Sequence, residues 1–201
     1  MKKGLLIAIE GIDGAGKTSV ANELVKFLKN MGYDAILLKE PSDSIYAQKI
    51  RGAKERLPPE EELELFLRDR EIDAIKNIIP ALQNGKVVVM DRYYYSNIAY
   101  QSARGINAEE IRKLNEKIAP KPDLVILLDV SPETALERIK PRGKLTLFEG
   151  KEYLEKVREN FLRIADKKTI IVNTEKPFNE VKREVFEIVK NLLNNYYSSR
   201  S

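Results

Sequence analysis

The chain has 201 residues, 43% of them hydrophobic and 33% charged, so it can bury one sizeable core and has the usual size of one domain. It contains no cysteine and no histidine. Their absence excludes disulfide frameworks, thiol nucleophiles, Ser-His-Asp triads and almost every zinc site. The chemistry must therefore use carboxylates, lysine, arginine, hydroxyls and backbone amides, with or without a hard metal ion.

The charges indicate an ordinary solvated surface. The 35 basic and 31 acidic side chains are interleaved along the chain, and the net charge is only +4. We therefore expect ion pairs and no nucleic-acid partner. The high Lys and Glu content favours a thermophilic source. The longest apolar runs, Leu5–Ile9 and Leu124–Leu128, are too short to cross a bilayer, and the N-terminus lacks a signal peptide, so we expect a soluble, cytoplasmic protein with no membrane partner.

Short apolar runs alternate with segments of helical period. The predicted strands are Gly4–Glu10, Asp34–Lys39, Lys86–Asp91, Leu124–Asp129 and Thr169–Asn173. The predicted helices are Lys17–Met31, Pro59–Gln83, Ala108–Ile118, Pro132–Lys140, Glu152–Asp166 and Phe178–Tyr197. This alternation predicts an α/β fold in which helices cover both faces of a five-stranded parallel sheet. No Gly/Ser-rich linker divides residues 1–201, so we expect one domain with its ligands beyond the carboxyl ends of the strands.

The clearest motif follows the first predicted strand and opens the first predicted helix. It matches G-x-x-x-x-G-K-[ST] and consists of Gly11, Ile12, Asp13, Gly14, Ala15, Gly16, Lys17 and Thr18. Glycines let backbone N–H groups turn toward phosphate oxygens, and a helix N-terminus favours negative charge. Lys17 is expected to reach the β- and γ-phosphates, and Thr18 to bind Mg²⁺. The motif predicts a P-loop NTPase fold that binds ATP with Mg²⁺.

A P-loop does not by itself distinguish a kinase from a GTPase, an ATPase or a motor. A GTPase should carry an N-K-x-D element late in the chain, and the nearest candidate, Asn173–Lys176, does not match it. Asp91 ends a predicted strand, where a carboxylate can hold Mg²⁺ through water; the alternative is that it caps the following helix. Arg92 beside it carries a planar fork suited to phosphate.

Two residues of the second predicted helix lie four apart and therefore share a face. Phe66 could provide a platform under a base, and Arg70 a guanidinium for the 5′-phosphate of the same nucleotide. Taken alone, Phe66 would be a core residue and Arg70 a surface ion-pair residue. The amide of Asn97 offers a donor and an acceptor for a pyrimidine edge, or could satisfy backbone in a short helix.

Several segments together resemble the thymidylate kinase family of P-loop nucleoside monophosphate kinases in order and spacing. They are Asp13 in the P-loop, Glu40-Pro41, Phe66–Arg70, Asp91–Gln101, Leu128–Arg138 and Phe148-Glu149. The resemblance extends from Gly4 to about Phe161. It implies a kinase that transfers the γ-phosphoryl group of ATP to dTMP, and a homodimer.

The resemblance also implies roles for individual residues. The acceptor contacts are Asp13, Glu40, Phe66, Arg70, Arg92, Ser96, Asn97, Tyr100 and Gln101. Tyr100 resembles the aromatic residue that packs against the deoxyribose, where a 2′-hydroxyl would collide. Asp13 resembles the carboxylate near the 3′-hydroxyl. Glu149 resembles a carboxylate near the acceptor sugar and the metal, so Thr18, Asp91 and Glu149 are the expected metal residues.

Residues 140–149 interrupt two predicted helices with Pro, Gly and three cations, and they resemble a short lid that closes over the triphosphate. The alternative is a solvated basic loop. In the family a catalytic cation comes from the P-loop or from the lid, and this P-loop offers only Asp13, Gly14 and Ala15 at its variable positions. Arg142 is therefore the leading candidate, followed by Lys144 and by Arg138, which is also expected at ATP.

The expected mechanism is direct in-line transfer, in which Mg²⁺, Lys17, Arg92 and the lid cation neutralise charge and Asp13 assists at the acceptor. Two alternatives stay open at this point. One is a kinase for another pyrimidine monophosphate such as dUMP or UMP. The other is a P-loop regulatory ATPase that acts on nucleic acid.

Overall fold

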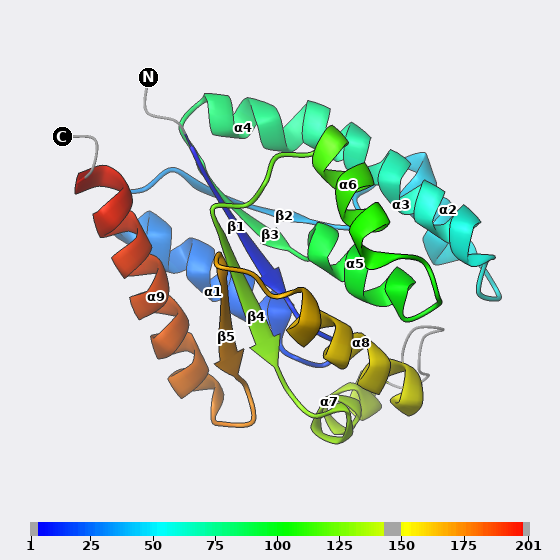
Figure 1. The fold of residues 1–201 in the computed structure, drawn as a ribbon. Helices are drawn as coiled ribbons and strands as arrows, with labels where there is room; N and C mark the ends of the chain where they lie inside the picture. The colour runs from blue at the N-terminus through cyan, green and yellow to red at the C-terminus, as the bar shows by residue number, and fades with distance from the viewer. Residues whose placement is uncertain (1–3, 143–149, 199–201) are drawn as a thin grey trace.

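The computed structural model of the chain describes residues 4–142 and 150–198. Its centre is one parallel sheet with the strand order β2-β3-β1-β4-β5 (Figure 1). The strands are β1 Leu5–Glu10, β2 Ala35–Lys39, β3 Val87–Asp91, β4 Leu124–Asp129 and β5 Thr169–Asn173. The predicted α/β fold with a five-stranded parallel sheet is confirmed, and each predicted strand is present to within one residue.

Helices cover both faces of the sheet. They are α1 Lys17–Asn30, α2 Ile45–Gly52, α3 Pro59–Asp73, α4 Ile79–Gln83, α5 Tyr94–Ser102, α6 Ala108–Ile118, α7 Pro132–Ile139, α8 Lys151–Ile164 and α9 Phe178–Ser198, with a π-helical turn at Ala74–Ile78 and a 3₁₀ turn at Lys140–Arg142. Helices α1 and α9 lie together on one face, where Phe27 stacks on Phe186 at 4.2 Å between ring centroids. Helices α4, α5 and α8 lie across the other face (Figure 1).

The three inner strands form the core of the molecule. All residues of β1 and β3 are buried, as are the first five of β4, because their sequences are nearly continuous runs of aliphatic side chains. The register brings the polar ends of these strands to one edge: Ile9 and Lys39 both stand opposite Asp91, and Glu10 stands opposite Leu127. The P-loop, Glu40 and Arg92 therefore leave the sheet side by side.

The structure differs from the expected helices in two places. The helix predicted for residues 59–83 is interrupted by the π-helical turn at Ala74–Ile78. Pro80 follows that turn and lacks the N–H that a continuous α-helix would use, so the pitch changes ahead of it. Helices α2 and α5 were not predicted; α5 is buried around nearly its whole circumference, so its sequence carries little helical periodicity.

The first turn of α5 is capped by a side chain from the central strand. The Glu10 carboxylate accepts hydrogen bonds from the backbone N–H groups of Tyr93, at 2.8 Å, and Ser96, at 3.1 Å. The Ser96 hydroxyl also donates to Glu10. Burial raises the pKa of Glu10, and these hydrogen bonds act against that rise. Tyr93 holds the N-cap position, so Asp91 does not cap this helix and Glu10 fixes α5 to the sheet.

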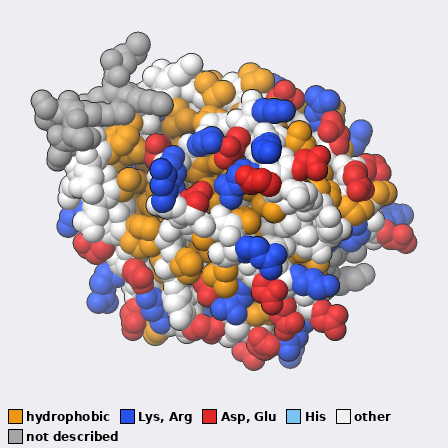
Figure 2. Space-filling model, in the orientation of Figure 1, with side chains coloured by type: hydrophobic (Ala, Val, Ile, Leu, Met, Phe, Trp, Pro, Cys, Tyr) orange, Lys and Arg blue, Asp and Glu red, His pale blue; other side chains and the backbone are white. Residues whose placement is uncertain are grey.

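The surface carries both signs of charge close together. Figure 2 shows acidic and basic side chains interspersed over the face in view, in accord with the interleaved sequence. Within the described residues, none of the helices is both long enough and apolar enough to cross a membrane.

Candidate active site

The P-loop curls between β1 and α1 through three glycines with positive φ. Gly11, Gly14 and Gly16 have φ values of 139°, 84° and 94°. A Cβ atom added to Gly14 would lie 2.3 Å from the carbonyl oxygen of Ala135, so this position needs glycine for space as well as for conformation. No side chain of the described structure caps the first turn of α1. Its N–H groups can therefore serve an anion.

Lys17 lies inside the loop. Its Nζ donates to the carbonyl oxygen of Ile12 at 2.6 Å, and only 6% of the residue is exposed. Burial and the nearby positive charge of Arg92 lower the pKa of Lys17 to about 7, although Asp13 and Asp91 oppose the shift. A bound triphosphate would favour the charged form, because it would place negative charge next to the amine.

The predicted metal residues Thr18 and Asp91 are in direct contact. The Thr18 hydroxyl donates to Asp91 Oδ2 at 2.6 Å, and the Lys39 amine lies 3.5 Å from the same oxygen. Asp91 is buried. A hydroxyl and a carboxylate are hard oxygen ligands, and Mg²⁺ in phosphate sites takes one or two such ligands plus phosphate and water. The chemistry of this pair therefore fits Mg²⁺ brought with the nucleotide.

An ion pair links the P-loop to the residue after β3. The Arg92 guanidinium donates to Asp13 Oδ1, and the Tyr100 hydroxyl donates to Asp13 Oδ2 at 2.7 Å. Arg92 has a positive φ of 71°, which is uncommon for a residue other than glycine and turns its side chain back over the P-loop. The guanidinium lies 5.5 Å from the centre of the Tyr100 ring. Three predicted site residues from separate segments therefore form one unit.

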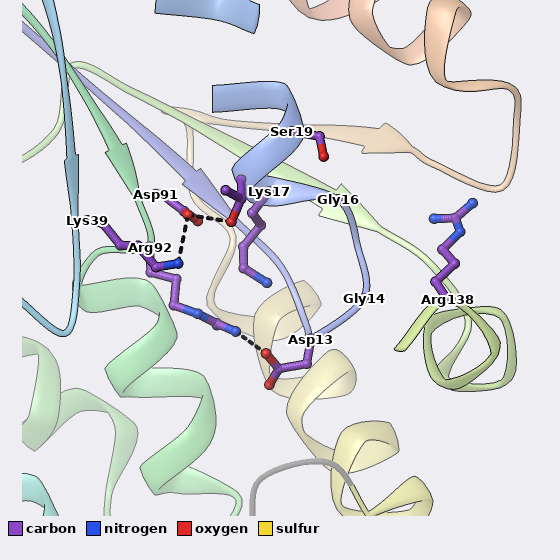
Figure 3. Close-up of a pocket in the computed structure, with 10 residues that line it drawn as sticks. Asp13, Gly14, Gly16, Lys17, Ser19, Lys39, Asp91, Arg92 and Arg138 are labelled. Atoms are coloured by element: carbon purple, nitrogen blue, oxygen red, sulfur yellow. Dashed lines mark hydrogen bonds and ion pairs between the residues drawn. The ribbon is translucent and has the colours of Figure 1, made fainter. Parts of the chain in front are cut away.

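These groups border a cavity of about 530 Å³ (Figure 3). Its lining residues are Asp13, Gly14, Gly16, Lys17, Thr18, Ser19, Lys39, Asp91, Arg92 and Arg138. Figure 3 shows Arg138, from α7, on the far side of the P-loop from Lys39 and Arg92. The Arg138 guanidinium also donates to the carbonyl oxygen of Thr174 at 2.6 Å. The prediction that Arg138 lies at the nucleotide is consistent with this position.

A second cavity of about 200 Å³ adjoins the first past Gly16, Ser19 and Arg138. Its outer wall comes from the segment after β5, through Thr174, Lys176, Phe178 and Val181. Sequence reasoning missed this segment, because it carries no motif and contributes to the site only through the packing of α9 beside α1.

The predicted acceptor residues Glu40, Arg70 and Asn97 meet in a buried cluster. Arg70 Nε donates to Glu40 Oε2 at 2.8 Å, and Arg70 Nη1 donates to Asn97 Oδ1 at 3.2 Å. Only 2% of Arg70 is exposed. Burial raises the pKa of Glu40 to about 7, which its partner Arg70 opposes. The interpretation of Arg70 as a surface ion-pair residue does not hold, since its partner is buried as well.

The remaining predicted residues surround these two clusters. Ser96 accepts from Arg92 Nη1 at 3.3 Å, and Gln101 accepts from Asn97 Nδ2 at 2.9 Å. Phe66 is only half-buried, whereas its neighbour Leu67 packs against the core. A half-buried ring on the Arg70 helix remains available to a ligand.

The side chain of Arg142, together with Lys144 and Glu149, lies outside the described residues. The structure also adds residues that the sequence did not single out, namely Glu10, Lys39, Glu62 and Asn115. The first two stand at the carboxyl edge of the sheet, where position could have indicated them; the last two act only through contacts made in three dimensions.

The comparisons with known proteins agree with this geometry. The family model described as thymidylate kinase matches residues 9–185. A probable thymidylate kinase of Archaeoglobus fulgidus is 62% identical over 190 residues, which cover 94% of this chain and 97% of that protein. One from Pyrococcus abyssi is 39% identical over 202 residues, covering 95% and 98%. A thymidylate kinase of Brachyspira hyodysenteriae is 46% identical over 163 residues, covering 79% and 80%.

A P-loop beside a strand-terminal carboxylate, at the edge of a parallel sheet, defines a P-loop nucleotide-binding enzyme. The family match narrows this class. The chain belongs to the thymidylate kinase family and is thus a nucleoside monophosphate kinase, an ATP-dependent transferase that phosphorylates dTMP. The alternatives of another pyrimidine acceptor or a nucleic-acid ATPase are not favoured.

The close contact at Gly14 gives a first testable prediction. Gly14→Ala should lower both stability and ATP affinity, because the new methyl group would meet the Ala135 carbonyl in addition to the strain of positive φ. Gly105→Ala is the matched control, since Gly105 has a φ of 100° and nothing within 4 Å of the added Cβ. We expect Gly14→Ala to cost at least about 1 kcal/mol more than the control in urea unfolding. Equal losses in the two variants would contradict the packing argument.

Proposed function

We propose that the two clusters of the site divide the thymidylate kinase reaction between them, with the P-loop cavity binding ATP and the Glu40–Arg70–Asn97 cluster binding dTMP. The observation that carries this proposal is the Asp13–Arg92 ion pair, which joins the two clusters. Asp13 belongs to the P-loop, and Arg92 also donates to Ser96 on the helix that bears Asn97. Both nucleotides would therefore present their phosphates to the same place.

On this proposal the triphosphate lies along the P-loop. The backbone from Gly11 to Thr18 would surround it, and Lys17 would exchange its bond to the Ile12 carbonyl for one to a phosphate oxygen. Thr18 and Asp91 would hold the Mg²⁺ that accompanies the nucleotide. When bound, the ion draws charge from the phosphates and orients them for transfer. Arg138 would reach the same triphosphate from the opposite side.

We place the adenine ring in the second cavity. This cavity continues from the P-loop cavity, and Phe178 and Val181 supply apolar surface there. The Arg138 guanidinium lines both cavities and could stack on the base. Because the wall comes from α9 and the segment before it, this arrangement assigns a role to the C-terminal part of the chain.

For the acceptor, access favours Arg92 as the cation for the 5′-phosphate. The Arg92 side chain is 18% exposed and lines the cavity, whereas that of Arg70 is 3% exposed and its charge is already balanced by Glu40. Arg70, which the sequence pattern suggested for the 5′-phosphate, would then hold the base together with Asn97 and Gln101. Phe66 would lie under it, while Tyr100 would pack against the sugar.

Transfer from this geometry needs positioning more than proton removal. The attacking group is a phosphate oxygen, so no strong general base is required. Lys17 and Arg92 would neutralise charge on the moving phosphoryl group, and Asp13 would hold the Arg92 fork in place through the ion pair. The Tyr100 hydroxyl supports the other oxygen of Asp13. A rigid arrangement of this kind keeps the reacting atoms aligned at little reorganisation cost.

Further proposals rest on the family and on sequence pattern. The chain forms one domain whose lid spans about residues 140–149. Arg142 is the leading lid cation, and Glu149 approaches the acceptor and the metal. The enzyme works as a homodimer. It acts in the cytoplasm, with no nucleic-acid or membrane partner.

The first test of this proposal concerns Lys17. Lys17→Met should lower kcat by roughly 10²–10³-fold or more, because a preorganised charge at the developing oxyanions is lost. Wild-type protein at pH 8 should take up a proton on binding ATP, since the free amine is mostly neutral above its pKa of about 7 and the triphosphate would recharge it. ATP affinity should accordingly weaken as the pH rises above 7.

Calorimetry in two buffers of different ionisation enthalpy measures this uptake, which Lys17→Met should lack. Lys26→Met is the control, because Lys26 lies on the same helix but is exposed and pairs with Glu23. Near-normal turnover of Lys17→Met, or proton uptake that survives in it, would refute the ATP assignment.

The second test concerns Arg70. The substitution should retain the positive charge, because Arg70→Ala would leave the Glu40 carboxylate buried without its Arg70 partner. Arg70→Lys retains the charge but loses the planar fork. We expect the KM for dTMP to rise by about tenfold or more and the KM for ATP to stay within about twofold. Arg68→Lys, two residues away in exposed ion pairs, is the control. A parallel rise in both KM values would show that Arg70 only supports the fold.

The third test concerns the sugar. The Tyr100 ring is held edge-on between Tyr153 and Phe161, at centroid distances of 6.0 and 6.3 Å, so it forms a fixed wall. Deoxy acceptors should be preferred by roughly 10- to 100-fold, because a ribose hydroxyl there would be buried without a partner at a cost of about 1–3 kcal/mol. Tyr100→Ala should narrow this preference by admitting ribonucleotides.

The control is Tyr100→Phe, which keeps the ring and loses the bond to Asp13. It should reduce kcat for both the deoxy and the ribo acceptor while the ratio of their kcat/KM values stays the same. The measurement is kcat/KM for the deoxy and ribo forms of one pyrimidine monophosphate. An unchanged ratio in Tyr100→Ala would place sugar selection elsewhere.

A further inference from the structure

Helices α3 and α5 are joined by a continuous chain of buried side-chain hydrogen bonds. Arg70 Nη1 donates to Asn97 Oδ1 at 3.2 Å, and Asn97 Nδ2 donates to Gln101 Oε1 at 2.9 Å. Gln101 Nε2 then donates to Glu62 Oε2 at 2.7 Å. The four side chains are at most 3% exposed. Glu62 has no part in the mechanism above, although it ends this chain.

The spacing in sequence explains why the chain closes. Glu62 and Arg70 lie eight residues apart on one face of α3, and Asn97 and Gln101 lie four apart on one face of α5. Asn115 connects a third helix, α6, to this chain and is completely buried. Its Nδ2 donates to Asn97 Oδ1 at 3.0 Å and to the Ile111 carbonyl at 2.8 Å, while its Oδ1 accepts from Arg70.

The direction of this chain follows from chemistry alone. A guanidinium has only donors, so the amides of Asn97 and Asn115 must turn their oxygens toward Arg70. A carboxylate has only acceptors, so Gln101 must turn its nitrogen toward Glu62. Reversing either amide on α5 would set donor against donor or acceptor against acceptor in a buried site, where an unmade hydrogen bond is costly.

The carboxylate end is held by further cations. Arg56 donates to both oxygens of Glu62, from Nε at 2.9 Å and from Nη2 at 2.7 Å. Arg104 lies 3.1 Å from Glu62 Oε2. The Arg56 guanidinium also lies 5.0 Å from the centre of the Tyr153 ring on α8. Glu62 is therefore fixed as the acceptor end of the chain.

We propose that Asn115 and Glu62 are positioning residues that hold the amides of Asn97 and Gln101 in one orientation for the acceptor base. The oxygen of Asn97 already receives two donors, from Arg70 and Asn115, so within the described structure this amide offers a ligand only an N–H. Arg70 likewise offers only donors. The base group that meets them must be an acceptor, such as a pyrimidine carbonyl.

This inference rests on the proposed function, because it takes Asn97 and Arg70 to be at the base. Cytosine carries an amino group, a donor, where thymine carries its 4-oxygen. The inference adds that discrimination against this amino group depends on Asn115 and Glu62, which lie outside the acceptor contacts. A positioning role predicts a change in the ratio of kcat/KM for dTMP over dCMP, with no change at the ATP site.

The test is Asn115→Asp, which is nearly isosteric and replaces the amide donor facing Asn97 with an acceptor. Arg70 would then favour the Asn97 amide with its oxygen inward, whereas the new carboxylate would favour it with its nitrogen inward. We expect the dTMP-to-dCMP ratio to fall by about tenfold or more, while the KM for ATP stays within about twofold. Asn160→Asp is the control, since Asn160 is half-buried and, like Asn115, donates through its amide, here to the Ala99 carbonyl at 3.0 Å.

A second variant keeps the test decisive if Asn115→Asp folds poorly. Glu62→Gln introduces a donor at the carboxylate end of the hydrogen-bond chain. The Gln101 amide then loses its fixed orientation, although Arg70 still orients Asn97. The ratio should fall by a smaller factor, roughly two- to tenfold. Glu61→Gln, on the exposed face of the same turn of α3, should leave it unchanged.

Calorimetric measurement of dTMP binding to the wild-type chain distinguishes failure of the positioning inference from failure of the proposed function. If the wild type does not bind dTMP, the proposed function itself fails. If it binds and prefers dTMP, but Asn115→Asp or Glu62→Gln keeps the full ratio, or loses dTMP and ATP affinity in parallel, the positioning inference is overturned and the proposed function stands.

Discussion

The ion pair between Asp13 and Arg92 is the contact on which the rest of the site depends. Asp13 belongs to the loop after β1 and Arg92 follows β3, so the pair exists only because these strands are neighbours in a parallel sheet with matched ends. Arg92 adopts a positive φ to make it, a conformation that costs roughly 1–2 kcal/mol and persists when the surroundings determine it. Through this pair the P-loop and the proposed acceptor cluster share one fixed cation.

Buried polar groups hold the surrounding helices in place. Glu10 on β1 anchors the start of α5, and the chain from Arg70 to Glu62 ties that helix to α3. Such groups contribute little net stability once the cost of their desolvation is counted. Any other arrangement of the helices would leave them buried without hydrogen bonds, which costs more, so these groups specify one arrangement. The proposed sites for the base and the phosphates are thus held in one arrangement, because neighbours from other elements fix the partners of each of these side chains.

Much of the fold follows from local sequence. Aliphatic runs ending in Glu10 and Asp91 predict inner strands, and the P-loop glycines predict the turn to α1. The helix α5 escaped prediction, because Tyr93, Tyr94 and Tyr95 are all buried and leave no periodic pattern. Family resemblance is what assigned Arg70 to the acceptor, since the residue pattern alone indicated a surface ion pair, and it favoured one of the two roles that the pattern left open for Asn97. Glu62 and Asn115 were missed since their roles depend on contacts between helices far apart in sequence.

The central claim is that one edge of the sheet brings ATP and dTMP together for direct transfer. The most direct measurement is coupled ADP release by the full chain with ATP and Mg²⁺, across a panel of deoxy- and ribonucleoside monophosphates. The account predicts that release requires a monophosphate, is fastest with dTMP, falls for UMP and dCMP, and does not respond to DNA. ADP release that proceeds equally without an acceptor, or that is faster with a ribonucleotide than with dTMP, would contradict it.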